Sequence, residues 1–85
     1  MYTLEVDSRA QRDMQRFHPT VRARLLDKLE LLCENCDNHP HKALKGKFRG
    51  KFSLTVAKDY RIVYSFNRRI RVVSVHQIGH RSKVY

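Results

Sequence analysis

The chain has 85 residues, of which 41% are hydrophobic, enough for one small folded domain and too many for a disordered tail. It contains no apolar run long enough to cross a membrane, and its first residues already carry charge, so we expect no signal peptide and a cytoplasmic location. The expected organisation is a single domain over residues 1–85.

The net charge of +10 is spread unevenly along the chain. Residues 1–38 hold six Arg/Lys against seven acids, whereas residues 39–85 hold twelve Arg/Lys against one acid, Asp59. Because like charges repel, this concentration predicts a surface for a polyanion such as nucleic acid, built by the C-terminal half. The alternatives are a solvated basic face without a ligand and a membrane surface, and the latter is disfavoured because the charges do not lie on one amphipathic helix.

The first half of the chain is predicted to form a strand and two helices. Residues 2–6 alternate between apolar and polar, as in a short strand. A capping box of Ser8 and Gln11 predicts a helix from there to about residue 17. Thr20 caps a second helix that continues to about residue 36, because apolar side chains recur at helical spacing. Two helices joined this tightly form a hairpin.

The second half is predicted to form a sheet. A basic loop from His41 to Gly50 is followed by three runs of period-two alternation, over residues 52–56, 61–66 and 70–78. Turn signals separate the runs at Lys58-Asp59 and Asn67-Arg68. The order predicts an α+β fold, with an N-terminal strand, a helical hairpin and a three-stranded antiparallel meander that forms one sheet packed on the two helices.

Several segments of the second half resemble a known family. They are Ala43-Leu44-Lys45-Gly46, Asp59-Tyr60-Arg61-Ile62-Val63-Tyr64 and the ending Gly79-His80-Arg81-Ser82-Lys83-Val84-Tyr85. In this order and spacing they resemble the RelE/ParE superfamily of toxin–antitoxin toxins, and within it the RelE and YoeB branch of ribosome-dependent mRNA endonucleases. The predicted strand, helix and helix of the first half fit the same fold, so the resemblance covers the whole chain.

The resemblance implies an activity and its partners. It implies a metal-independent mRNA interferase without a cofactor, which cleaves mRNA in the ribosomal A site by attack of the 2′-OH and so inhibits translation. Its partners would be the ribosome, mRNA and a cognate antitoxin protein that binds it in a hetero-oligomer, with no membrane involved.

The resemblance also implies that Arg61 and Arg81 hold the scissile phosphate and stabilise the pentavalent transition state. Charge builds on the non-bridging oxygens during attack, and preorganised guanidinium groups offset it. Arg61 alternates with apolar residues, so we expect its side chain on the open side of the sheet. The alternative is that each arginine merely pairs with an acid, which the single acid of the C-terminal half disfavours.

Proton transfer is assigned to His80 and Tyr85. Attack by the ribose hydroxyl needs a base on the 2′-OH and an acid on the leaving 5′ oxygen. The family places a tyrosine at or near the C-terminus, where it stacks on a base or moves a proton, and Tyr85 matches that position. The alternatives are a frayed terminus for Tyr85 and a turn residue for His80. The general base is left open between His80, Tyr85 and a lysine.

The basic loop supplies the candidate RNA-binding residues, which are Lys45, Lys47, Arg49 and Lys51. They either assist the chemistry directly or only raise affinity through counterion release. On the first strand of the meander this chain has Ser53, Leu54 and Thr55, where some relatives carry basic side chains.

Two cysteines and two histidines lie close together in the sequence, at Cys33, Cys36, His39 and His41. Cys-x-x-Cys is a spacing typical of metal or redox sites. Because both cysteines continue the apolar stripe of the second helix, we favour a core-and-loop interpretation and predict no metal site. A disulfide between cysteines three positions apart in a cytosolic helix is disfavoured.

Two alternative functions use the same fold or the same charge. One is a ParE-like toxin that poisons DNA gyrase without nuclease activity. The other is a non-catalytic module that binds RNA or the ribosome and needs only the charge. The ending with His80, Arg81 and Tyr85 favours the nuclease.

Overall fold

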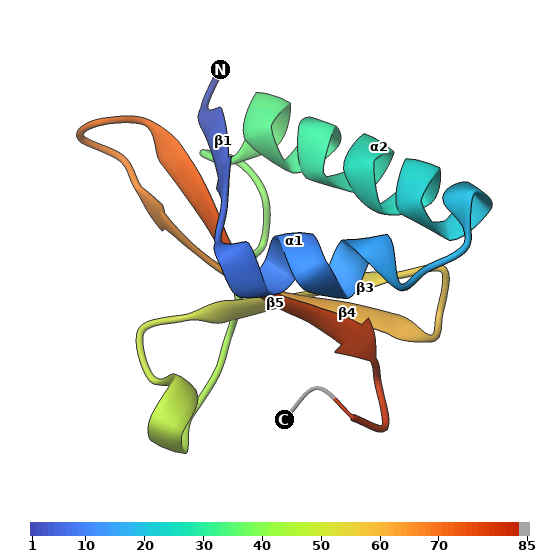
Figure 1. Cartoon of the computed structure of the whole chain (residues 1–85). Helices are drawn as coiled ribbons and strands as arrows, with labels where there is room; N and C mark the ends of the chain where they lie inside the picture. The colour runs from blue at the N-terminus through green and yellow to red at the C-terminus, as the bar shows by residue number, and fades with distance from the viewer. Residues whose placement is uncertain (84–85) are drawn as a thin grey trace.

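The computed structural model describes residues 1–83 and shows a sheet with two helices packed on it (Figure 1). The elements in chain order are β1 (Thr3–Val6), α1 (Ser8–Gln15), α2 (Pro19–Asn35), β2 (Lys42–Ala43), the short 3₁₀ helix η1 (Gly46–Phe48), β3 (Phe52–Val56), β4 (Tyr60–Asn67) and β5 (Val72–His80). The predicted α+β class and the helical hairpin are confirmed. The strand β2 and the helix η1 lie inside the predicted loop of residues 41–50 and were not expected.

The sheet has five strands in the order β1-β5-β4-β3-β2. The antiparallel meander β3-β4-β5 forms its centre, as predicted, and β1 lies parallel to β5 at one edge. The register pairs β1 only with Val72–Val75. The second half of β5, residues 76–80, therefore has no strand on its outer side, and we call this stretch the free edge of β5.

The hydrophobic core lies between the helices and one face of the sheet. Helix α2 contributes most of the helical part, with Leu25, Leu29 and Leu32 almost fully buried. The sheet contributes alternate residues, among them Ile62, Tyr64 and Val75. Burying a side chain of this size stabilises the fold by about 1.5–3 kcal/mol, so this face holds much of the stability.

Both helices begin differently from the prediction. Asp7, not Ser8, precedes the first turn of α1, and its side chain makes no capping hydrogen bond. The Gln11 amide donates to the Val6 carbonyl at 2.9 Å instead of closing a capping box. Helix α2 begins at Pro19, and the Nδ1 atom of His18 accepts the Thr20 N–H at 3.1 Å. Proline suits the first turn of a helix, where its missing N–H needs no partner.

The segment from Cys33 to His41 forms part of the core and of the loop that borders it. Cys33 and Cys36 are buried, and burial raises the pKa of both thiols. His41 holds the following loop, because its Nε2 donates to the Cys36 carbonyl at 2.8 Å and its Nδ1 accepts the Tyr64 hydroxyl at 2.5 Å. Within residues 1–83 no three His, Cys, Asp or Glu side chains gather as metal ligands would. The core-and-loop interpretation is confirmed for the cysteines.

The two hairpin turns of the meander are close to their predicted places. Ala57 and Lys58 connect β3 to β4 with left-handed φ angles of 50° and 69°, which non-glycine residues adopt at a cost. In the second turn the Asn67 side chain accepts the N–H groups of Arg69 and Ile70, at 2.9 and 3.2 Å. In the described part of the chain, neither helix has the length and apolar character of a membrane span.

Candidate nucleic-acid interface and catalytic face

The sheet face turned away from the core carries mostly polar side chains and lies opposite α1 and α2, although Ser53 and Val63 on it are buried. We call it the open face. It is formed by alternate residues of the three central strands, which are Ser53 and Thr55 on β3, Arg61, Val63 and Ser65 on β4, and Gln77 and Gly79 on β5. Their neighbours along each strand belong to the core. The side chains on the open face are mostly small and polar, so the arginine among them is prominent.

Arg61 lies in a cross-strand row with Thr55 and Gly79. Its neighbour Ile62 is fully buried in the core, which fixes Arg61 on the open face. Because Gly79 has no side chain, the surface of β5 beside Arg61 stays low. At this position no side chain from β5 stands beside the guanidinium.

Arg81 is held at the same end of the sheet. Its backbone N–H donates to the Asp59 carbonyl at 2.7 Å, and the Lys83 N–H donates to the His80 carbonyl at 2.8 Å. These bonds turn the chain directly after β5 and attach it to the turn between β3 and β4. The Arg81 side chain is exposed. The structure thus brings the two predicted phosphate-binding arginines to one end of the sheet.

His80 lies on the other side of β5 from Arg61. It shares the core side of the strand with Ile78, and its ring stands 6.0 Å from the ring of Tyr60. Its Nδ1 accepts hydrogen bonds from Ser82, from the hydroxyl at 2.9 Å and from the backbone N–H at 3.3 Å. The ring is therefore not placed beside Arg61. Tyr85, the other predicted proton-transfer residue, lies outside the described residues.

A β-bulge decides which side His80 occupies. Val63 pairs with Gln77 and Tyr64 with Val75, so His76 is an extra residue in β5. Before the bulge the odd-numbered residues of β5 face the core, and after it the even-numbered residues do, because one inserted residue exchanges the two faces. The bulge is fastened by His76, whose Nδ1 donates to Asp7 at 2.9 Å and whose Nε2 accepts the Ser65 hydroxyl at 2.7 Å.

The basic loop stands at the opposite side of the open face. The Leu44 N–H donates to the Lys51 carbonyl at 3.0 Å and closes the loop, while Gly46 and Gly50 supply left-handed turns with φ of 65° and 88°. The predicted RNA-binding residues are exposed, except Lys51, which is half-buried. Figure 1 shows η1 and the segment after β5 projecting from the side of the sheet away from α2. The open face thus lies between two groups of cations.

These cations are not neutralised by neighbouring acids. In residues 1–83 the carboxylates in ion pairs are Asp37, with Arg71 at 3.3 Å, and Asp7, with His76 at 2.9 Å. Neither pair involves the loop lysines or Arg81. A polyanion approaching the open face would therefore meet loop lysines and an Arg81 side chain that no carboxylate of residues 1–83 holds in an ion pair.

A groove that the sequence did not predict runs along the free edge of β5. Its volume is about 350 Å³, and it is lined by Arg9 and Asp13 of α1, by Arg16 and Phe17 directly after that helix, by Gln77, Ile78, Gly79 and His80 of β5, and by Lys83. The net charge of residues 1–38 gave no sign of the arginines that line this groove, because the acids of the same segment balance them. Only the contact of α1 with β5 reveals that they adjoin the basic half.

A family comparison identifies the class of protein. Residues 4–85 match the family described as the ParE toxin of the type II toxin–antitoxin system parDE. The chain belongs to this toxin family. The RelE/ParE superfamily resemblance of its sequence is thereby confirmed, and the chain is a toxin of a type II toxin–antitoxin system. No curated protein matches the chain.

Solved structures agree with this membership. A chain of the intact RelBE toxin–antitoxin complex of Escherichia coli is 29% identical, with a TM-score of 0.77 over 93% of this chain and 95% of that one. The isolated RelE toxin of Escherichia coli is 26% identical, with a TM-score of 0.77 over 94% and 84%. A chain of the RelBE2 complex of Mycobacterium tuberculosis reaches a TM-score of 0.81 at 23% identity, over 94% and 98%, and shows the shared fold.

Proposed function

We propose that this toxin is a ribosome-dependent endoribonuclease that cleaves mRNA in the A site. The observation that carries the proposal is the placement of Arg61 on the sheet face away from the core, beside a glycine, with Arg81 at the same end of the sheet. Guanidinium groups suit a phosphate whose negative charge grows during reaction, and both arginines belong to the same end of the sheet. Similarity to the RelE toxin supports the same activity.

The proposed reaction uses the RNA's own nucleophile and needs no metal. A base removes the proton of the ribose 2′-OH, and the resulting oxygen attacks the adjacent phosphorus. The bond from phosphorus to the 5′ oxygen breaks, and an acid delivers a proton to that oxygen. The products are a 2′,3′-cyclic phosphate and a 5′-OH. Arg61 and Arg81 would bind the non-bridging oxygens throughout.

Tyr85 and His80 are the proposed proton-transfer residues, and Tyr85 is the first candidate of the two. Tyr85 follows the turn that holds Arg81, and a phenol there would stack on a base beside the scissile bond. His80 is separated from Arg61 by the thickness of β5. It would reach the reacting ribose only where the RNA passes around the free edge of β5.

The proposed partners follow from the charge and the family. The lysines of the basic loop, Lys45, Lys47, Arg49 and Lys51, would bind the backbone of mRNA and ribosomal RNA. A cognate antitoxin would cover the open face with an acidic or amphipathic segment, consistent with the toxin–antitoxin complexes among the solved relatives. The proposed place of action is the cytoplasm.

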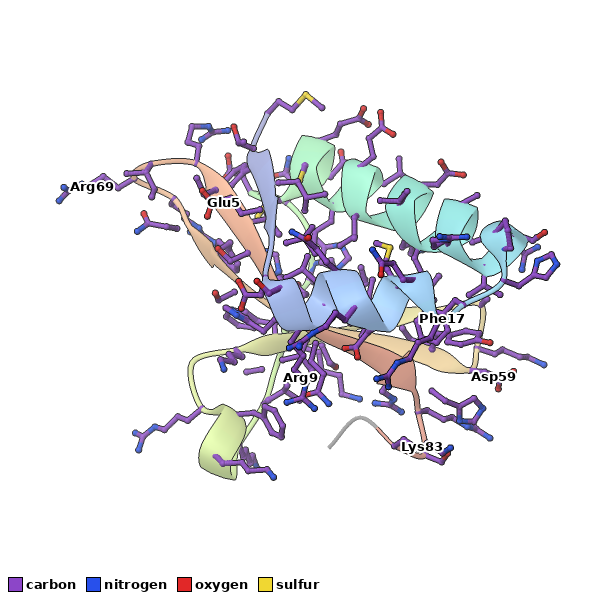
Figure 2. All side chains as sticks on the ribbon, viewed as in Figure 1. Glu5, Arg9, Phe17, Asp59, Arg69 and Lys83 are labelled. Atoms are coloured by element: carbon purple, nitrogen blue, oxygen red, sulfur yellow. The ribbon has the colours of Figure 1, made fainter. Side chains whose placement is uncertain are left out.

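Primer extension on a reporter mRNA, after brief expression of the toxin, tests the proposal. We expect cuts within translated codons for the wild type and none for Arg81→Ala or Arg61→Ala. The matched control is Arg69→Ala, because Arg69 lies at the far tip of the β4–β5 hairpin (Figure 2). Cuts that persist in both site variants would overturn the assignment of the arginines.

A second candidate function is poisoning of DNA gyrase, which the ParE name of the matching family favours. It predicts a DNA damage response on expression, with intact mRNA. Growth arrest with neither mRNA cuts nor DNA damage would instead favour a block of the ribosome without cleavage.

A further inference from the structure

The groove along the free edge of β5 adjoins the open face at Gly79. Gly79 contributes to both, since it pairs with Arg61 on the open face and lines the groove. No strand covers residues 76–80 on the outer side, because β1 ends its pairing at Val75. A flexible polymer bound on the open face can therefore continue around this edge into the groove.

The groove carries an excess of permanent positive charge. Arg9 near the start of α1 and Arg16 at its C-terminal cap border the groove together, and Lys83 lines it from the turn after β5. Figure 2 shows Arg9 beneath α1 and Lys83 on the same lower side of the view. None of the three makes an ion pair with a carboxylate in residues 1–83.

The single acid of the groove has a structural partner. One oxygen of Asp13 accepts the backbone N–H of Ile78 at 3.1 Å, which satisfies a donor of the free edge and ties α1 to β5. Three permanent cations against this one engaged carboxylate leave the groove positively charged. That balance suits consecutive phosphates of a nucleic-acid strand.

Aromatic rings form one end of the groove. The rings of Phe17 and Tyr60 are 5.2 Å apart, and Tyr60 in turn contacts His80 at 6.0 Å, both edge to face. Phe17 and His80 line the groove themselves. Unstacked bases of single-stranded RNA pack on such rings, whereas a paired helix keeps its bases stacked within itself.

We propose that this groove binds the backbone of single-stranded mRNA next to the cleavage site, with Arg9, Arg16 and Lys83 on its phosphates. His80, which lines the same groove, would then contact a nucleotide at the edge of β5. The inference rests on the proposed nuclease function and extends it, since it gives the path of the RNA away from the open face. An acidic antitoxin segment is the competing occupant.

Binding of a short single-stranded 2′-O-methyl RNA, followed by fluorescence anisotropy over a range of salt concentrations, tests the groove. This probe lacks the attacking hydroxyl, so the full-length wild-type toxin can be used without cleavage. The test variant is the double substitution Arg9→Gln and Arg16→Gln. The control is Arg12→Gln with Arg24→Gln, which removes the same charge from exposed positions outside the groove.

We expect the groove variant to weaken binding about tenfold or more at low salt. Its salt slope should fall by about 1.4, since each phosphate contact on a single strand contributes about 0.7. The control should keep the wild-type slope, and circular dichroism should show both variants folded.

Three results would overturn the groove assignment. They are equal losses in the two double variants, no binding of the probe by the wild type, and a groove variant that loses only affinity for the antitoxin. Failure of the nuclease proposal is separate, because it is read from mRNA cuts and Arg81→Ala. If the toxin binds the probe through the groove but never cuts mRNA, the groove proposal stands and the nuclease proposal is wrong.

Discussion

The two faces of the sheet are made by the same strands and differ in almost every physical respect. Facing the helices, Ile62 and Val75 are fully buried in the core. One position away, Arg61 and Gln77 lie on the open face, where no helix packs. Burial of one face stabilises the fold, and this allows the other to carry polar and charged side chains that contribute little to stability. The comparison separates residues needed for folding from residues available for chemistry.

The largest effect is expected on the covered face. Leu29→Ala removes a fully buried side chain and should lower the free energy of unfolding by about 2–5 kcal/mol. Thr55→Ala on the open face should change it by less than about 0.5 kcal/mol. Urea unfolding followed by circular dichroism measures both. Equal losses would show that the open face also supports the fold.

The reverse pattern is expected for activity. Arg61→Lys keeps the charge but loses the planar two-donor geometry, so we expect cleavage of ribosome-bound mRNA to slow by about 100-fold or more, with unchanged unfolding. Arg69→Lys is the matched control, at the exposed hairpin tip. A rate that survives in Arg61→Lys would mean that charge alone suffices at this position.

The polar contact inside the covered face should have an intermediate effect. Tyr64→Phe removes the hydroxyl that His41 accepts and leaves Nδ1 of that ring without its partner. We expect a loss of about 1–3 kcal/mol in unfolding free energy. Burial raises the pKa of Tyr64, so the wild type should also lose stability above about pH 10, where the unfolded tyrosine ionises. A Tyr64→Phe protein should lack that part of the alkaline loss.

The turn between β3 and β4 offers a small gain. Lys58 has a left-handed φ of 69°, so Lys58→Gly should relieve strain and raise the unfolding free energy by up to about 1 kcal/mol. Lys58→Ala is the control, because it removes the same side chain and keeps the strain. Thermal unfolding of both variants compares them, and an equal change would assign the effect to the side chain.

The smallest effect is expected at the surface cluster of Tyr2, Asp37 and Arg71. The Tyr2 hydroxyl donates to Asp37 at 2.6 Å, which lowers the pKa of that carboxyl, and Arg71 lowers it further. A carboxyl with a depressed pKa stabilises the fold above its unfolded pKa of about 4, and this contribution is lost as the pH falls through the folded value. Asp37→Asn should therefore destabilise slightly at neutral pH and progressively less as the pH falls below the unfolded pKa of Asp37. A difference that persists in acid would contradict this origin.

Local patterns in the sequence predicted the elements well and their ends less well. The alternation of Ile62 and Tyr64 and the helical spacing of Leu25, Leu29 and Leu32 located core residues, because each face of an element repeats within a few positions. The start of α2 was wrong by two residues, since the helix begins at Pro19 and the His18 side chain takes the capping role that Thr20 was expected to fill. Strand β2 is too short to show any alternation.

Local sequence patterns could predict only part of the site. The motifs around Arg61 and Arg81 and the lysines of the basic loop follow from the sequence, and the structure gathers them around the open face. The placement of His80 does not follow from strand alternation. The bulge at His76 exchanges the two faces of β5 ahead of His80. The side chains that hold the bulge are Asp7, between β1 and α1, and Ser65 of β4.

The sequence by itself determined the α+β class, the toxin family, the basic C-terminal half and the motifs with Arg61 and Arg81. Each of these features can be recognised from residues close together in the sequence, through their periodicity, charge or spacing. Only the tertiary structure decided that β1 pairs with half of β5, that α1 brings Arg9 and Arg16 to the remaining edge, and that His80 faces the groove they form. These features depend on contacts between residues far apart in the chain, and no local pattern encodes them.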